Sequence, residues 1–377
     1  MKAAYIHIPF CEQICYYCDF NKFYLENQPV EAYLDALQRE VEATLRQHPH
    51  DELKTIFIGG GTPTSLSATQ LENLLEGLNR TLIYSPQEME FTVEANPGDL
   101  TMDKLTLMKN MGVNRLSLGV QTFHDPLLEK IGRTHRSKEA LQAVEDAKKA
   151  GYSNISIDLM YGLPGQTMAM FEESIVTAGS LDIQHVSSYS LQVEPKTVFY
   201  NLMRAGKLSL PPEDTEADMY ETLMERMAGL GFFQYEISNF AKKGFESRHN
   251  LTYWANEEYY GFGAGAHSYL GGKRKANAGP LNHYLQFVNE KGTAYIEEHT
   301  VTEQEKMEEE LFLGLRRAAG IRADTFLSKY GRPVNDVFGR ELDDLAGRGL
   351  IKQTEEGYTL TKEGRLLGNE VFQAFLK

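Results

Sequence analysis

The first 230 residues repeat one pattern: a short apolar run with strand-like composition, a loop, and then a stretch with the apolar periodicity of a helix. The six apolar runs are 3–9 (AAYIHIP), 54–60 (KTIFIGG), 89–96 (MEFTVEAN), 113–120 (VNRLSLGV), 153–162 (SNISIDLMYG) and 184–193 (QHVSSYSLQV). The helix-like stretches are 30–46, 67–79, 101–110, 137–150, 167–179 and 211–231. Strict alternation indicates a parallel sheet with right-handed crossovers, either doubly wound or closed toward a barrel. Both architectures place functional groups at the C-terminal ends of the strands.

Chain length and pattern together predict three parts. A chain of 377 residues is too long for one small core, which favours a large barrel-type domain with a smaller second domain. The barrel is expected over 1–231, and an aromatic, Gly-rich connecting segment follows over 232–295. Residues 296–377 regain helical periodicity and end as helix, two short strands and helix, similar to a winged-helix module. Because acidic residues stand near its turns, we expect this module to pack against the barrel and not to bind DNA.

The charge balance and apolar pattern exclude several classes of partner. The formal net charge is −15, which repels a phosphate backbone, so no nucleic-acid partner is expected. The basic stretch 271–279 (GGKRKANAG) is predicted to be a solvated loop. No apolar run has the length of a membrane span, and the stretch MKAAYIHIPF lacks the pattern of a secretion signal. We therefore expect a cytoplasmic protein, in which clustered cysteines act as metal ligands.

The three cysteines of the chain, Cys11, Cys15 and Cys18, follow the first strand with the spacing C-x3-C-x2-C. Three thiolates are one short of a closed zinc site, but they suit a [4Fe–4S] cluster that keeps its fourth iron open. The alternatives are a zinc knuckle completed by a distant histidine and three small buried hydrophobic side chains. Because all three cysteines fall within eight positions, we favour the cluster.

Glycines, carboxylates and amides stand at or near the ends of the other strands. Glycines let a ligand approach the backbone, acids and amides suit ribose hydroxyls, and an arginine can clamp a carboxylate with its forked donors. Each residue alone could equally be a turn, a cap or a surface ion pair. Together they predict a ligand site, and the residues concerned are Gly60, Gly61, Thr62, Glu94, Gln121, Arg133 and Asp158.

The cysteine motif resembles that of the radical S-adenosylmethionine (SAM) superfamily, whose hallmark is C-x3-C-x2-C after the first strand of a partial (β/α)6 barrel. The resemblance implies a TIM-like barrel in which SAM chelates the open iron and is cleaved to a 5′-deoxyadenosyl radical by an electron from the cluster. The motifs YIHIPFC, GGGTP, EANP, GVQ, GRTH and IDLMYGLPGQT are similar, in this order, to those of oxygen-independent coproporphyrinogen III oxidases and their relatives. That likeness implies a HemN-type C-terminal domain. It also implies a SAM site lined by Tyr5, Tyr17, Gly60, Gly61, Thr62, Glu94, Gln121, Arg133, Asp158 and Gln192.

Two branches of this family differ at Phe20. The oxidases resemble C-x3-C-x2-C-x-C, whereas this chain carries Phe20 at the last position. The HemW-type branch has C-x3-C-x2-C-D-F and a later H-N-x-x-Y-W motif, present here as HNLTYW over 249–254. This resemblance implies a heme chaperone that binds heme, delivers it to an acceptor protein and lacks coproporphyrinogen oxidase activity. The alternatives are a radical SAM oxidase that converts propionates to vinyl groups, and a radical SAM enzyme with another substrate.

Residues 245–269 hold the side chains that heme binding needs, namely axial donors and aromatic rings. Composition alone favours a different interpretation, in which these rings pack between the barrel and the C-terminal domain. The family resemblance favours His249 as a heme-binding residue, and it leaves His267 and the tyrosines open. His7 is expected to be a hydrogen-bonded core residue. A peripheral contact with a membrane surface stays compatible with this sequence.

Overall fold

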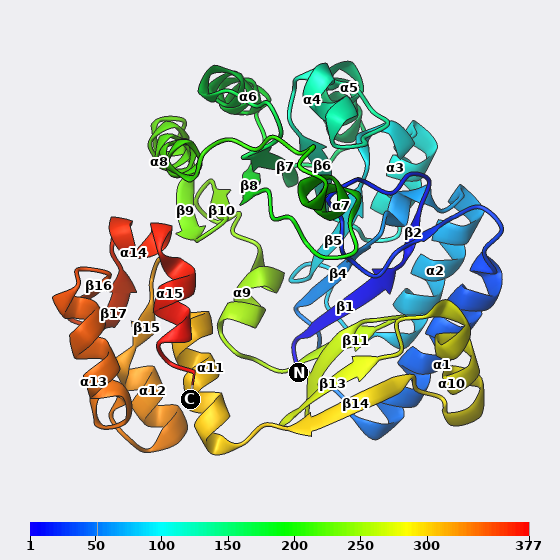
Figure 1. Ribbon diagram of the computed structural model, residues 1–377. Coiled ribbons are helices and arrows are strands. Elements are labelled where there is room, and N and C mark those ends of the chain that lie inside the picture. The colour runs from blue at the N-terminus through cyan, green and yellow to red at the C-terminus, as the bar shows by residue number, and fades with distance from the viewer. Residues whose placement is uncertain (51, 377) are drawn as a thin grey trace.

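The six predicted strands form the parallel centre of one large sheet (Figure 1). They are β1 (Ala3–Ile8), β4 (Thr55–Gly60), β5 (Glu90–Ala95), β6 (Arg115–Gln121), β7 (Ile155–Tyr161) and β8 (His185–Ser190). Their order in space follows their order in the chain, as right-handed crossovers require in a partial barrel. This computed structural model describes residues 1–50 and 52–376, so Lys377 of the predicted C-terminal domain lies outside the described residues. The expected partial (β/α)6 barrel is confirmed.

The helices between these strands cover the outer face of the curved sheet (Figure 1). Ser67 shows why one of them starts where it does, because it forms a capping box with Gln70. The six predicted helices are α1 (Val30–Gln47), α2 (Ala68–Thr81), α3 (Met102–Asn110), α5 (Ser137–Lys149), α6 (Met168–Ser180) and α8 (Glu213–Gly229). Shorter helices are η1 (Pro63–Ser65), η2 (Pro97–Asp99), α4 (Asp125–Lys130) and α7 (Val198–Arg204).

The predicted connecting segment adds strands to both edges of the sheet. On one side β10 pairs antiparallel with β8, and on the other β11 pairs parallel with β1, giving 12 strands among the described residues. The added strands are β9 (Phe233–Glu236), β10 (Asn239–Ala241), β11 (Tyr259–Phe262), β12 (His267–Leu270), β13 (Lys273–Asn277) and β14 (Tyr295–Thr300). Two helices lie in the same region, α9 (Arg248–Trp254) and α10 (Leu281–Lys291). The segment is therefore part of the sheet as well as a connection.

The prediction of a solvated loop over 271–279 is wrong. Residues 273–277 form β13, which pairs with β12 and β14. Lys275 is only 7% exposed, and its ammonium lies 3.2 Å from a carboxylate oxygen of Glu298 on the neighbouring strand. A basic, Gly-flanked stretch carries little apolar signal, so its cross-strand partners determine the strand.

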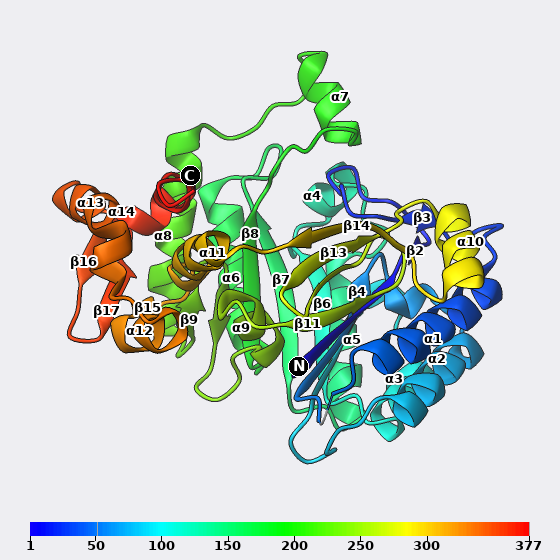
Figure 2. The same ribbon diagram turned by 90° about the horizontal axis from the view of Figure 1, so that it is seen from below.

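The C-terminal part has a hydrophobic core of its own, with Leu311, Phe326, Phe338 and Leu342 among its members. Its helices are α11 (Glu303–Gly314), α12 (Ala323–Tyr330), α13 (Val334–Gly347), α14 (Lys362–Leu366) and α15 (Gly368–Gln373). Its small sheet has the order β15 (Ile321–Arg322), β17 (Gly357–Leu360), β16 (Ile351–Gln353). The helices and the two-stranded wing confirm the winged-helix-like order, and Figure 2 shows this domain to one side of the barrel.

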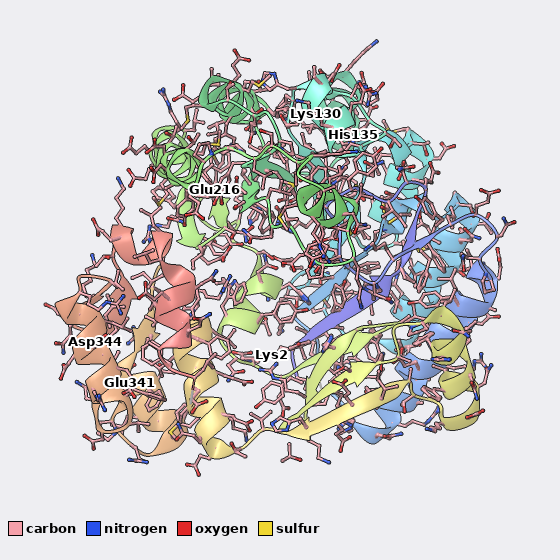
Figure 3. The ribbon with its side chains drawn as sticks, viewed as in Figure 1. Lys2, Lys130, His135, Glu216, Glu341 and Asp344 are labelled. Carbon is pink, nitrogen blue, oxygen red and sulfur yellow. The ribbon has the colours of Figure 1, made fainter. Side chains whose placement is uncertain are left out.

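Acidic side chains lie on the surface of this domain. Asp343 and Asp344 are both exposed on α13, and Figure 3 labels Asp344 together with Glu341 of the same helix. Throughout the described residues, the structure has no helix that is both long and apolar enough to cross a membrane.

Glu40 joins the outer strands to the barrel. Its buried carboxylate accepts hydrogen bonds from the Gly263 backbone N–H (2.8 Å), the Tyr284 hydroxyl (2.7 Å) and Asn277 Nδ2 (2.6 Å). Burial raises the pKa of Glu40 to about 7, although these three donors oppose the shift. The folded protein therefore favours the protonated form of Glu40 more strongly than the unfolded chain does.

Replacing Glu40 by glutamine is expected to remove a pH dependence of stability. The pKa of Glu40 in the folded protein lies above its unfolded value of 4.5. Its contribution to the free energy of unfolding is therefore lost as the pH rises through about 7. The loss between pH 4 and pH 8 should be on the order of 3 kcal/mol of the free energy of unfolding. Urea unfolding of both proteins at each pH measures it, and equal slopes against pH for the two proteins would contradict the prediction.

Candidate functional site

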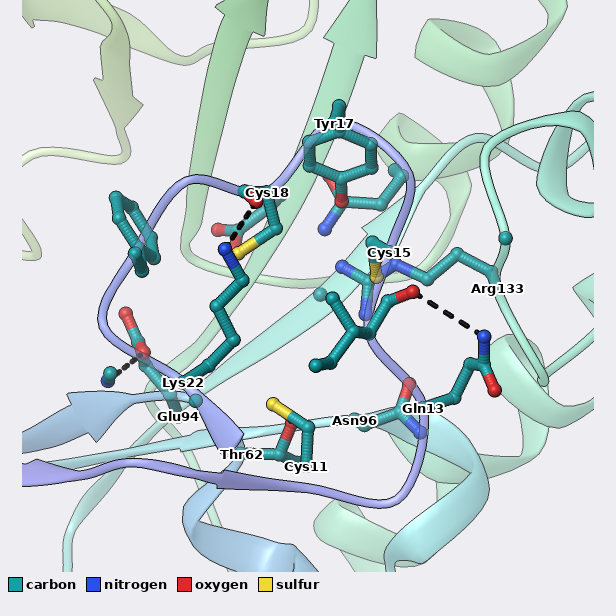
Figure 4. Close-up of a pocket in the computed structure, with 18 of the residues that line it drawn as sticks. Cys11, Gln13, Cys15, Tyr17, Cys18, Lys22, Thr62, Glu94, Asn96 and Arg133 are labelled. Carbon is teal, nitrogen blue, oxygen red and sulfur yellow. Dashed lines mark hydrogen bonds between the residues drawn. The ribbon is translucent and has the colours of Figure 1, made fainter. Parts of the chain in front are cut away.

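A cavity of about 520 Å³ lies at the C-terminal ends of the barrel strands (Figure 4). The loop after β1 covers it, held at its base by the pairing of β2 (Phe10–Cys11) with β3 (Phe23–Tyr24). Cys11, Cys15 and Cys18 all line this cavity as free thiols. The loop after β1 thus brings the three cysteines to the same cavity.

The thiols suit a polynuclear cluster better than a single ion. Among the described residues, no group of three His, Cys, Asp or Glu side chains lies close enough to hold one metal ion. A cube-shaped cluster has a different requirement, because each thiolate binds a different iron. The surroundings are also shaped around the sulfur: a Cβ atom on Gly61 would lie 2.7 Å from the Phe10 carbonyl oxygen and 3.0 Å from Cys11 Sγ. The residues present therefore fit a [4Fe–4S] cluster.

Burial favours the protonated thiol at Cys11 and at Cys18. It raises the pKa of Cys11 to about 11, while a hydrogen bond from the Thr62 hydroxyl (3.5 Å) opposes the shift. Burial also raises the pKa of Cys18. Because thiolates and not thiols bind iron, cluster binding must release these protons.

Two carboxylates face the cavity from β5 and β7, which lie on either side of β6. Glu94 accepts a hydrogen bond from the Gly60 N–H at 3.2 Å, and Asp158 accepts one from the Ser117 hydroxyl at 3.4 Å. Burial, reinforced by the nearby Asp158, raises the pKa of Glu94 to about 7, and burial raises the pKa of Asp158 to about 6. Carboxylates whose pKa lies near neutral pH are suited to accept hydrogen bonds from hydroxyl groups of a ligand.

Arg133 and Gln121 complete the polar wall. Within the described residues, the buried Nε of Arg133 has no hydrogen-bond partner, while the guanidinium bonds Tyr17 and lies near Cys15. Gln121 has a φ of +68°, a conformation that costs a non-glycine residue energy and that is concentrated at ligand sites. The unpartnered N–H of the Arg133 guanidinium can donate a hydrogen bond to the carboxylate of a ligand.

Most of the predicted site residues meet in this cavity. Those that line it are Cys11, Cys15, Tyr17, Cys18, Gly60, Gly61, Thr62, Glu94, Gln121, Arg133, Asp158 and Gln192. Sequence reasoning did not single out Asn96, Ser117 or Tyr189, which line it too. Tyr189 and Asn96 also follow the strand-end rule, so that rule could have found them.

Tyr5 lies in a different place. It lines a second cavity, and its hydroxyl is hydrogen-bonded to His7 Nδ1 at 3.0 Å. Tyr5 precedes the last residue of β1 by three positions, which places it deeper in the barrel than the strand-end residues. His7 is confirmed as a hydrogen-bonded core residue, because it is 6% exposed and its Nε2 bonds the Asn21 carbonyl oxygen at 2.7 Å.

His249 lies in the interior of the protein. Its ring is 1% exposed, with Nδ1 hydrogen-bonded to the Thr55 hydroxyl (2.9 Å) and Nε2 to the Tyr253 hydroxyl (2.8 Å). Burial lowers its pKa to about 3, so the imidazole is neutral. In this conformation both ring nitrogens are occupied, and a role as heme ligand requires one of these hydrogen bonds to break.

The start of α9 is tied to the barrel. Glu90 accepts hydrogen bonds from the backbone N–H groups of Arg248 (2.9 Å) and His249 (3.0 Å), which satisfies the first turn of the helix. At the other end, the Trp254 ring lies 4.6 Å from the guanidinium carbon of Arg316. Some aromatic residues of this region therefore do pack toward the C-terminal domain.

The comparisons with known proteins agree with this geometry. Residues 5–178 match the Radical SAM superfamily, and residues 301–367 match the HemN C-terminal domain. A partial barrel with three cysteines in the segment after its first strand thus defines a radical SAM protein. The chain is 58% identical over 376 residues to the heme chaperone HemW of Bacillus subtilis (strain 168), covering 100% of this chain and 99% of the relative. It belongs to the HemW family.

More distant relatives and one solved structure extend the comparison. HemW of Lactococcus lactis subsp. lactis (strain IL1403) is 46% identical, covering 100% of this chain and 97% of that protein. The structure of coproporphyrinogen III oxidase (HemN) from Escherichia coli matches with a TM-score of 0.87 and 24% identity, covering 99% of this chain and 90% of that chain. At this identity the structural likeness shows the fold alone.

Proposed function

We propose that this protein is a heme chaperone, which binds heme and delivers it to an acceptor protein in the cytoplasm. The observation that carries the proposal is 58% identity, over the full length of both chains, to a protein named heme chaperone HemW. Phe20 supports it, because the related oxidases resemble a motif with a fourth cysteine at this position.

The proposal includes a [4Fe–4S] cluster and SAM in the large cavity. Cys11, Cys15 and Cys18 would hold the cluster, and Arg133 would bind the carboxylate of SAM. Glu94 and Asp158 would accept hydrogen bonds from ribose hydroxyls. When bound, the cluster supplies an electron that can reduce SAM. The chain itself binds and orients these groups.

The second candidate function is oxidative decarboxylation of a porphyrinogen. The observation in its favour is that all the predicted SAM-site residues except Tyr5 line one cavity, since a pure carrier has no evident need for them. The two functions differ in what they do with a tetrapyrrole, because a chaperone returns it unchanged and an oxidase turns propionates into vinyl groups.

One experiment separates the two functions. The protein is reconstituted anaerobically with iron and sulfide, then given SAM, a reductant and coproporphyrinogen III. We expect no vinyl product on a catalytic timescale, whereas a heme titration of the same sample should saturate at one heme per chain. Turnover to decarboxylated product would overturn the chaperone assignment, and so would the absence of heme binding.

A further inference from the structure

A second cavity, of about 270 Å³, lies beside the cysteine-lined one. Its wall includes the imidazoles of His7 and His267 and the rings of Tyr5, Phe20, Tyr253 and Tyr259. Phe20 lines both cavities, so the two adjoin at the loop that carries the last cysteine. The cavity is thus an aromatic space with two imidazoles, directly next to the proposed cluster site.

Of these two imidazoles, only that of His267 is available to a metal. His7 uses both ring nitrogens, one with the Tyr5 hydroxyl and one with the Asn21 carbonyl oxygen. His267 is exposed at the first position of β12, and neither of its ring nitrogens has a hydrogen bond within the described part of the chain. Heme iron commonly takes a histidine imidazole of the protein as its ligand. The free imidazole of His267, at the mouth of an aromatic cavity, can fill this role.

The HNLTYW motif reaches this cavity through Tyr253. Its hydroxyl is hydrogen-bonded to His249 Nε2 at 2.8 Å, and its ring lies edge-on to Tyr259 with 4.5 Å between the ring centres. His249 in turn stacks on Phe57, with 5.1 Å between the ring centres. His249 therefore orients the tyrosine that forms the wall.

Phe20 supplies an apolar surface that is open to a ligand. Its side chain is 64% exposed, so most of the ring is accessible to a ligand. A tetrapyrrole is larger than this cavity, since pockets that enclose drug-sized ligands have volumes of roughly 300–1,000 Å³. One part of the macrocycle would fill the cavity and the rest would cover Phe20. An incompletely enclosed ligand is suited to release to another protein.

We propose that heme binds in this second cavity with His267 as its axial ligand. Phe20, Tyr253 and Tyr259 form the apolar wall, and His249 acts as a positioning residue for Tyr253. This inference rests on the proposed heme-chaperone function and specifies its binding site. It also explains why a buried histidine that binds no iron stands at the head of the motif.

The test is a heme titration of the cluster-reconstituted protein, followed by absorbance under anaerobic conditions. His267→Ala should weaken heme binding about tenfold or more and remove the spectral signature of imidazole ligation. Added imidazole should restore that signature in the variant. Because His267 is exposed, this substitution should leave the circular dichroism unchanged. His283→Ala is the matched control, since His283 is also exposed and lines neither cavity.

The outcomes are distinct. If His267→Ala binds heme with wild-type affinity and spectrum, this site is wrong while the proposed function stands. If His267→Ala keeps the spectral signature of imidazole ligation and His249→Ala loses it, then His249 is the iron ligand and the inference is overturned. If the wild-type protein binds no heme, the proposed function itself fails.

Discussion

Replacing Cys15 by alanine is expected to abolish the iron–sulfur cluster while the fold survives. Two thiolates cannot hold three irons of a cube, and Cys15 lies half-buried in the loop over the cavity and not in the hydrophobic core. After anaerobic reconstitution, the iron content should fall from about four atoms per chain to less than about one. Iron and sulfide analysis measures the change, and thermal unfolding of the metal-free protein tests the fold.

Glu12→Gln is the matched control for the cysteine substitution. Glu12 lies in the same loop and lines the same cavity, but it is exposed and is not expected to bind iron. Its reconstituted iron content should equal that of the wild type. A Cys15→Ala protein that keeps a full complement of iron and sulfide would falsify the three-thiolate site. A zinc knuckle would instead take one zinc ion per chain and give no visible absorbance.

Replacing Arg133 by alanine is expected to weaken SAM binding by roughly 100-fold. The buried guanidinium has an unpartnered Nε, so a ligand carboxylate gains charge-assisted hydrogen bonds that no other protein group already makes. The variant also removes one of two nearby positive charges that favour the ionised forms of Glu94 and Asp158, while Arg115 remains. Calorimetric titration of the reconstituted protein with SAM measures the affinity.

Two further variants define what Arg133 contributes. Arg133→Lys keeps the charge but loses the forked donors, so we expect an affinity between those of the wild type and the alanine variant. Arg136→Ala removes an arginine three positions away that does not line the cavity, and its SAM affinity should match the wild type. Equal affinities of the wild type and Arg133→Ala would mean that the carboxylate of SAM binds elsewhere.

Local patterns predicted the six parallel strands and most of the candidate site, whereas the resemblance to the radical SAM superfamily predicted the barrel. Each of the six apolar runs became a parallel strand, because a run buried on both faces carries its own hydrophobic signal. The strand-end rule then found Glu94, Gln121 and Asp158, since all parallel strands present their carboxyl ends at one edge. Cys11, Cys15 and Cys18 were found by their spacing alone.

The sequence did not predict the strands at the two edges of the sheet. The basic residues of β13 form a strand because β12 and β14 pair with it from either side. β11 pairs with β1, although more than 250 residues separate the two strands in the chain. Pairing over such a distance depends on tertiary contacts, and the apolar periodicity of a short segment does not predict it.

The amino-acid sequence by itself determined where the barrel strands lie along the chain, the three thiols and the residues at the strand ends, because these features arise from spacing within short segments. Only the tertiary structure decided which histidines are free. His249 and His267 are both candidates in the sequence, yet Thr55 and Tyr253 occupy the ring nitrogens of His249, whereas His267 stands at the open end of a strand. The availability of a side chain depends on its neighbours in space, and these are set by how distant segments pack.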